Sequence, residues 1–174
     1  IDSRVKADER MAEIMEDYRE TLAQAIQLDL ILGFAPTDAA RFGSAGGDSP
    51  LGNLVAESMR KRKGVETDFA VTNSLGIRSD ISAGPVTIEQ MYQVFPFENT
   101  ITTMFLSGRE VIDVFDYIAR RSSSRGCQAQ AQIAGARVVL QCGGCNQAKR
   151  PADWPALPAD VIGCAQKIQF FNND

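Results

Sequence analysis

The sequence predicts a mixed α/β (α+β) domain, and three observations support this fold class. The chain has 174 residues, which is enough for one ordinary domain with its own core. Amphipathic helical segments alternate with strand-like segments along it. Their order of strand, helix, helix, strand and helix indicates a layered α/β arrangement rather than a helical bundle or a β-sandwich.

The first segment, residues 3–30, is predicted to be one long amphipathic helix whose start Ser3 can cap. Apolar side chains recur in it at three- and four-residue steps with charges between them, namely Val5, Met11, Ile14, Met15, Tyr18, Leu22, Ala25 and Ile26. Such a helix either packs on the domain or links it to a neighbour.

A second helix is predicted within residues 47–64. Ser49 is a good N-cap, Pro50 suits the first helical position and Gly64 ends the segment. The basic run 60–63 lies at the negative end of the helix dipole. We interpret this run as a solvated helix end, with anion binding as the alternative.

Capping boxes indicate two further helices. Thr87 and Gln90 have the required spacing, and Ser107 and Glu110 repeat it before residues 108–121. Five segments are predicted to be strands from their β-branched and aromatic residues, namely 30–36, 68–73, 99–106, 136–142 and 164–171. A long loop connects the last two.

The composition excludes several classes of function. The chain has no histidine, which excludes a complete Ser-His-Asp enzyme and a self-contained metallohydrolase, while enzymes that use only carboxylates or lysine stay open. A net charge of −4 disfavours a nucleic-acid partner. No apolar run is long enough to span a membrane. The chain starts with Ile1 and ends in a strand-like run, so we expect it to be part of a longer protein.

Four cysteines lie in the last 50 residues of the chain, at Cys127, Cys142, Cys145 and Cys164. An even number favours two disulfides and an oxidising compartment. A zinc site and a set of reduced thiols are the alternatives, because Cys142 and Cys145 form a C-x-x-C.

In the stretch VTNSLGIRSD, residues 71–80, an amide and a guanidinium are predicted to lie close together. A strand ends in Asn73, a tight turn follows, and Arg78 emerges from it. One interpretation is a strand end closed by turn chemistry. The other is the rim of a ligand site, where the amide faces a base edge and the arginine faces phosphate oxygens.

The motifs GDSPLGNLVAESMR, DFAVTNSLGIRSDI, GPVTIEQMYQVFPFENTITTMFLSGREV and AGARVVL together resemble one family. They are similar to the C-terminal, substrate-specificity domain of the secreted 5′-nucleotidase family, which includes UDP-sugar hydrolases and 2′,3′-cyclic nucleotide phosphodiesterases. The resemblance covers roughly residues 40–140. Residues 1–30 resemble the helix that joins this domain to the catalytic one.

The resemblance implies that residues 1–30 are an interdomain linker helix. Residues 31–174 would then be the recognition domain, cut before a final G-G-D-G-[FY] segment. In the family, two divalent metal ions and a catalytic His–Asp pair belong to an N-terminal metallophosphatase domain. The chain alone is therefore expected to hold no cofactor and to have no phosphatase activity. Its parent is expected to be a periplasmic or secreted hydrolase of nucleoside phosphates.

The resemblance also assigns roles to four residues. Asn73 is expected near the base, Arg78 near the phosphate or ribose, and Phe97 stacked on the base, while Arg41 is a candidate phosphate contact. Phe95 is expected in the core, because only one of two alternating aromatics can face the ligand.

Two positions depart from the family pattern. Leu75 and Glu98 replace glycines that are usual there, so a non-catalytic interaction module without nucleotide binding is the alternative. Four cysteines allow three pairings. We favour Cys142 with Cys145 and Cys127 with Cys164, since some family members carry a C-x-x-C disulfide near this position.

Overall fold

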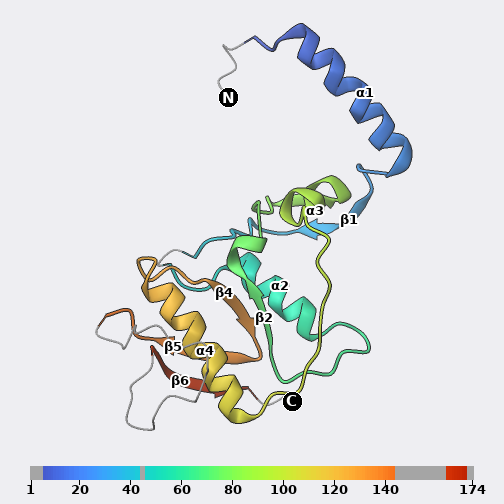
Figure 1. Cartoon of the computed structure of the whole chain (residues 1–174). Coiled ribbons are helices and arrows are strands. Elements are labelled where there is room, and N and C mark those ends of the chain that lie inside the picture. Colours follow the sequence, from blue (N-terminus) through green and yellow to red (C-terminus); the bar gives the residue numbers. More distant parts are fainter. Residues whose placement is uncertain (1–5, 44–45, 144–163, 172–174) are drawn as a thin grey trace.

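The computed structural model describes residues 6–43, 46–143 and 164–171. Figure 1 shows a body of short strands and helices, from which the first helix, α1 (Glu9–Ala25), projects at one end. Helices and strands are mixed along the body, so the predicted α/β class is confirmed.

The strands form antiparallel pairs in the described part of the chain, with no larger sheet there. The pairs are β1 (Ile31–Ala35) with β3 (Gly84–Thr87), β2 (Ala70–Asn73) with β4 (Ala131–Ala134), and β5 (Ala136–Leu140) with β6 (Ala165–Phe170). Gly135 turns the chain between β4 and β5 with φ +78°. A Cβ at this position would lie 3.0 Å from the Cα of Phe69, so the turn depends on glycine.

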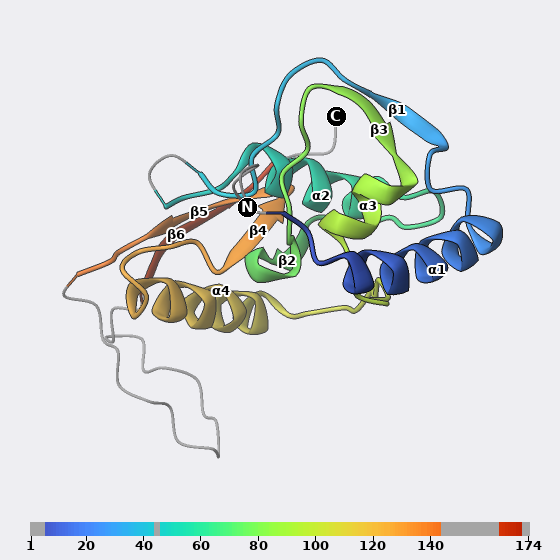
Figure 2. The same ribbon diagram turned by 90° about the horizontal axis from the view of Figure 1, so that it is seen from above.

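Helices cover the strands from two sides. Seen from above, α2 (Pro50–Arg60) and α4 (Gly108–Ser123) lie on opposite sides of β4, β5 and β6 (Figure 2). α2 packs against β2 and β4, while α4 packs against β5 and β6. The short helix α3 (Ile88–Val94) follows β3 directly.

Two main groups of buried apolar side chains hold these layers together. The first core cluster contains Leu51, Ile77, Ile81 and Val94 and lies at the exit of β2. The second core cluster contains Val111, Phe115 and Ala136 and lies under α4. The first core cluster therefore anchors the turn that follows Asn73.

The helix signals in the sequence are confirmed at three helix starts. The Ser49 hydroxyl accepts a hydrogen bond from the Gly52 amide at the start of α2. Both capping boxes are formed, one before α3 and one before α4. At the second box, hydrogen bonds from the backbone and hydroxyl of Ser107 hold the pKa of Glu110 below its usual value.

The helix predicted over residues 3–30 is shorter than expected. Within the described residues it begins at Glu9, with the Asp8 carboxylate as its N-cap, while Ser3 lies outside them. It ends at Ala25, because the chain then turns to meet the start of α3. There the carbonyl of Leu30 accepts a hydrogen bond from the amide of Ile88.

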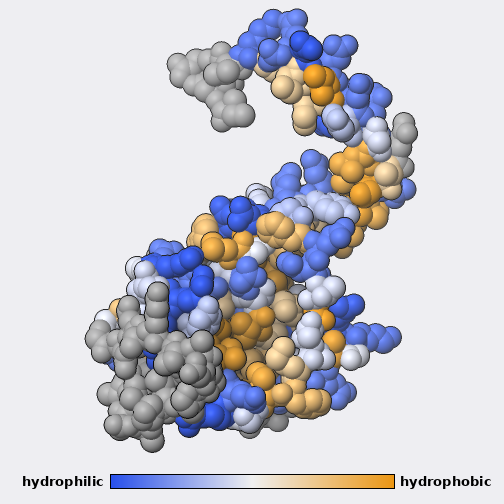
Figure 3. Space-filling view, viewed as in Figure 1, coloured by the Kyte–Doolittle hydropathy of each residue, from blue (hydrophilic) through white to orange (hydrophobic). Residues whose placement is uncertain are grey.

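The apolar stripe of α1 is not covered by the described part of the chain. Met11, Met15 and Tyr18 are 58%, 53% and 70% exposed. Figure 3 shows apolar side chains on this helix and, more densely, around the junction between α1 and β1. The stripe is thus an unpartnered surface within the described structure.

One predicted strand, residues 99–106, is wrong. This segment runs between α3 and α4 without helix or strand structure. Its side chains are mostly exposed, and Phe105 is fully so. A strand requires a hydrogen-bonded neighbour, and none of the described segments pairs with this one. Conversely, β3 and β4 were not predicted, whereas the other four predicted strands are present as β1, β2, β5 and β6.

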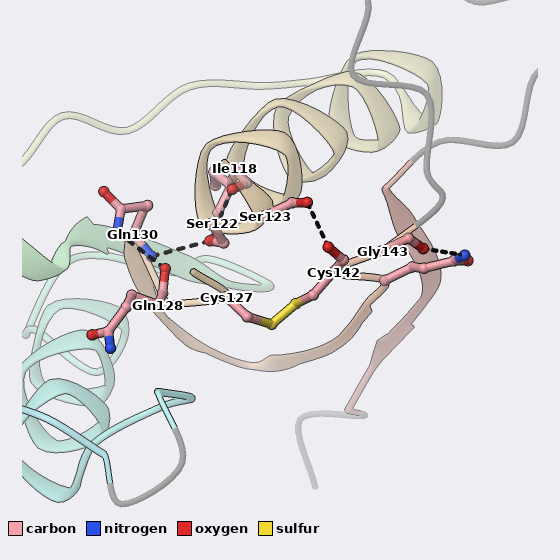
Figure 4. Close-up of a disulfide and its surroundings, with 9 residues drawn as sticks. Ile118, Ser122, Ser123, Cys127, Gln128, Gln130, Cys142 and Gly143 are labelled. Carbon is pink, nitrogen blue, oxygen red and sulfur yellow. Dashed lines mark hydrogen bonds between the residues drawn. A yellow bond between two sulfur atoms is a disulfide. The ribbon is translucent and has the colours of Figure 1, made fainter. Parts of the chain in front are cut away.

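The favoured disulfide pairing is also wrong. Cys127, in the turn after α4, is bonded to Cys142 at the end of β5, with the two Cα atoms 5.5 Å apart (Figure 4). The hydroxyl of Ser123 donates to the carbonyl of Cys142 and helps to hold these segments together. Cys164 is disulfide-bonded as well, and Cys145 lies outside the described residues. The predicted oxidation of the cysteines is confirmed for Cys127, Cys142 and Cys164.

The C-terminal end of α2 carries an ion cluster. The Glu57 carboxylate accepts hydrogen bonds from Arg60 Nε at 2.9 Å and Nη2 at 2.8 Å, and it pairs with Lys61 Nζ at 3.0 Å. The Arg60 and Lys61 hydrogen bonds lower the pKa of Glu57 to about 2. Two members of the basic run are therefore part of a helix-end ion cluster.

We expect Glu57→Gln to destabilise the protein at neutral pH by less than about 1 kcal/mol, because this cluster is partly exposed. The folded-state pKa of Glu57 lies below its ordinary value of 4.5. The stabilisation is therefore present above pH 4.5 and is lost as the pH falls toward 2. Urea denaturation across this pH range measures it. Glu20→Gln on α1 is the control, and a difference unchanged by pH would contradict the prediction.

Candidate functional site

The candidate site begins where β2 ends. Asn73 pairs with Ala131 of β4, and the 3-10 turn η1 (Ser74–Gly76) follows immediately. The turn is closed by a hydrogen bond from the amide of Ile77 to the carbonyl of Ser74. Ile77 is 2% exposed and fixes the turn in the first core cluster.

The amide of Asn73 folds back over this turn. A Cβ at Gly76 would lie 2.9 Å from Asn73 Oδ1 and 3.1 Å from Nδ2, which is too close for an ordinary contact. The turn therefore needs glycine at this position for the Asn73 side chain to occupy its place. Asn73 itself is exposed.

Arg78 is tied to the turn and to α3. Its backbone amide donates to the carbonyl of Val94 at 2.9 Å, and its Nη1 donates to the carbonyl of Leu75 at 3.3 Å. Its guanidinium carbon lies 6.0 Å from the centre of the Phe97 ring. This distance is at the outer limit of a cation–π contact.

Phe97 presents its ring to solvent, since it is 52% exposed. Phe95 instead is half-buried against the first core cluster, as predicted. The two aromatics after α3 thus face opposite environments, and Phe97 is the one available for stacking.

Arg41 reaches the same turn from a distant part of the chain. Its Nη1 donates to the carbonyl of Arg78, and its backbone amide donates to Asp80 Oδ1 at 2.7 Å. Its guanidinium carbon also lies 4.7 Å from the centre of the Phe42 ring. Asp80 is a contact that the sequence analysis missed, because nothing local to its sequence indicates a partner 39 positions away.

Contacts and chain neighbours therefore connect Arg41, Asn73, Arg78 and Phe97 on an exposed surface, which we call the rim. None of the four is buried. Two cavities in the described structure are lined by none of these four residues. One of those cavities, about 1070 Å³, is an apolar groove beside residues 101–106.

The two departures from the family pattern also lie at the rim. Leu75 is 49% exposed in the middle of η1, so its side chain extends to solvent. Glu98 is exposed next to Phe97.

The arrangement offers a flat ring face, an amide and two guanidinium groups. An amide both donates and accepts hydrogen bonds, and guanidinium groups bind phosphate oxygens. No group of three or more His, Cys, Asp or Glu side chains is positioned to hold a metal ion within the described ranges. A search of the same residues finds no helix with the length and apolarity required to cross a bilayer.

Comparisons with known proteins agree on one relationship. Residues 30–144 match the family described as "5'-nucleotidase, C-terminal domain". The endonuclease YhcR of Bacillus subtilis is 34% identical over 114 residues, which are 66% of this chain and 9% of that protein. A 5′-nucleotidase of Vibrio vulnificus is 31% identical over 143 residues, which are 82% of this chain and 25% of that protein.

The fold also has a counterpart among solved structures. The 5′-nucleotidase precursor from Thermus thermophilus superposes with a TM-score of 0.68 at 21% identity, covering 95% of this chain and 30% of that one. This chain thus spans between 9% and 30% of the length of these three proteins.

Proposed function

The chain belongs to the family of 5′-nucleotidase C-terminal domains, and from this premise we propose that it recognises the nucleotide for a 5′-nucleotidase-like phosphoesterase. One observation carries the proposal: the Phe97 ring is exposed, and the guanidinium carbon of Arg78 lies over it at 6.0 Å from the ring centre. A stacking surface next to a cation suits a ligand that joins an aromatic base to an anion.

Each rim residue then has a chemical role. Phe97 stacks on the base, and the Asn73 amide hydrogen bonds its edge. Arg78 supplies positive charge for phosphate oxygens. Arg41 adds a second cation, whose guanidinium bonds the Arg78 backbone and whose Nε lies 4.0 Å from Asp80 Oδ1. In support, the Arg41 guanidinium donates to the backbone carbonyl of Arg78, and the Arg78 guanidinium donates to the carbonyl of Leu75.

Hydrolysis is assigned to another part of the parent protein. The family implies two divalent metal ions that activate the attacking water in an N-terminal metallophosphatase domain. We therefore assign this chain no step of the reaction. This chain contributes binding and specificity instead.

The domain organisation follows the same proposal. Residues 1–30 act as the linker to the catalytic domain, and residues 31–174 form the recognition domain. The exposed apolar stripe of α1 supports a linker that packs against a neighbouring domain. The disulfide between Cys127 and Cys142 supports a periplasmic or secreted location.

A second candidate function is an interaction module that keeps the fold without binding nucleotides. The Leu75 side chain favours it, because it extends to solvent beside Asn73, where the family pattern has no side chain. Titration of the chain with AMP separates the two functions.

We expect AMP to bind the chain weakly, with a Kd on the order of 1 mM, because one ring face leaves half of the base in water. Amide NMR titration should shift signals of the rim. Phe97→Ala should weaken binding at least about fivefold, since stacking on one aromatic contributes about 1–3 kcal/mol.

In the parent enzyme, the same change should raise KM more than it lowers kcat.

Tyr117→Ala is a closely matched control. Tyr117 is 53% exposed and lies under Arg121 at 5.9 Å, but on α4. It should leave AMP binding unchanged. If AMP shifts no rim signal, or if both variants weaken binding equally, nucleotide recognition is wrong and the interaction module is supported.

A further inference from the structure

Gln132 is a buried polar residue between two segments that carry the rim. It lies in β4 and is 2% exposed. Its Oε1 accepts a hydrogen bond from the Ser49 amide at 3.0 Å, and its Nε2 donates to Ser74 Oγ at 2.9 Å. One side-chain amide therefore joins the start of α2 to the first residue of η1.

Both of these segments lead directly to rim residues. Ser74 follows Asn73 and begins the turn to which the Arg78 side chain is bonded. At the other end, the amide of Leu51 in α2 donates to the carbonyl of Ala40, the residue before Arg41. A shift of the Gln132 side chain would therefore move Asn73 and Arg78 relative to Arg41.

The packing around Gln132 fits this role. A Cβ on Gly52 would overlap the Cγ, Cδ and Oε1 atoms of the Gln132 side chain. Gly52 is buried within α2, where glycine is unfavourable for helix stability. Its presence is explained by the close approach of the glutamine side chain to the helix.

A polar side chain at such a buried position needs both of its hydrogen bonds. Burying an amide is costly unless its donor and acceptor are satisfied, and an apolar residue of similar size would fill the space without that cost. Directional bonds at both ends of the amide instead fix the position of η1 relative to α2.

We propose that Gln132 is a positioning residue for nucleotide recognition, which holds Asn73, Arg78 and Arg41 in their binding arrangement without touching the ligand. The proposal rests on the proposed function for its effect on affinity. Its effect on the order of the turn can be measured without any ligand.

The test replaces Gln132 by methionine, which has a similar length and no amide. We expect amide hydrogen exchange at Ile77 and Arg78 to become about fivefold faster, and AMP binding to weaken by about the same factor. Ser74→Ala removes the partner hydroxyl and should act in the same direction. The double variant should show less than the sum of the two effects, because both changes break one network.

Ser107→Ala is the control, since it removes a capping hydroxyl at the start of α4 and lowers stability away from the rim. It should leave exchange at Ile77 and Arg78 and the AMP affinity at their original values. The conservative Gln132→Glu keeps an acceptor for Ser49 and can accept from the Ser74 hydroxyl, so it should restore part of the order lost in Gln132→Met.

The positioning role is wrong if Gln132→Met leaves exchange in the turn unchanged, or if Ser107→Ala changes it equally. If the original chain binds no AMP while Gln132→Met still loosens the turn, the proposed function fails and the positioning of the turn stands. If AMP binds and Gln132→Met loosens the turn without changing affinity, nucleotide recognition stands and the positioning role in binding fails.

Discussion

Replacing Phe115 by alanine is expected to lower the free energy of unfolding by about 3–5 kcal/mol, the usual range for a buried phenylalanine. Phe115 is 1% exposed in the second core cluster. Its ring centre lies 5.4 Å from that of Phe69, which in turn lies 5.4 Å from that of Phe170 in β6. The cavity left by Phe115→Ala would therefore open between α4 and the strands it covers.

Urea denaturation followed by circular dichroism measures this loss as a lower midpoint. Phe105→Ala is the control, because it removes the same side chain from a fully exposed position. The control should change the free energy of unfolding by no more than about 0.5 kcal/mol. Equal effects of the two substitutions would show that α4 does not pack on the strands as described.

Removing the disulfide between Cys127 and Cys142 should have the second largest effect. The bond closes a loop with a sequence separation of 15 residues, for which restriction of the unfolded chain contributes about 3 kcal/mol. Replacing both cysteines by alanine should therefore destabilise the protein by about that amount. A reductant should lower the stability of the original chain in the same direction.

A peptide map without reductant gives the direct readout. It should recover Cys127 and Cys142 in one cross-linked peptide, while the variant without these cysteines should lose that species. Free thiols at both positions would contradict the pairing and would remove the support that this disulfide gives to a periplasmic or secreted location.

Local signals in the sequence were sufficient to predict most helices and their starts. Ser49, Thr87 and Ser107 each bond an amide within the next three residues, so the information lies in a few neighbouring positions. Segment 99–106 has equally favourable residues for a strand. Strand formation depends on a partner elsewhere in the chain, and that dependence cannot be read from the segment itself.

The residues of the candidate site were proposed from the resemblance and not from local signals. The resemblance suggested Asn73, Arg78 and Phe97 as ligand contacts, and their roles stay predictions. In the structure the Arg78 side chain bonds the carbonyl of Leu75, and its guanidinium carbon lies 6.0 Å from the centre of the Phe97 ring. Gln132 could not be identified, because the alternation of alanine and glutamine at 128–132 does not reveal which glutamine is buried. The predicted cysteine pairing was wrong because the pairing depends on a tertiary contact, in which the turn after α4 meets the end of β5.

The contact of Arg41 with the backbone of Arg78 has an evolutionary consequence under the proposed function. The Arg41 side chain and the Arg78 backbone form one bonded unit, so under that function a mutation that moves either of them would disturb phosphate recognition. The side chains of Leu75 and Glu98 lie beside this unit and extend to solvent. Under the proposed function, substitutions at these two positions would leave that bond intact, so they would change the preference for a base or sugar without removing the phosphate contacts.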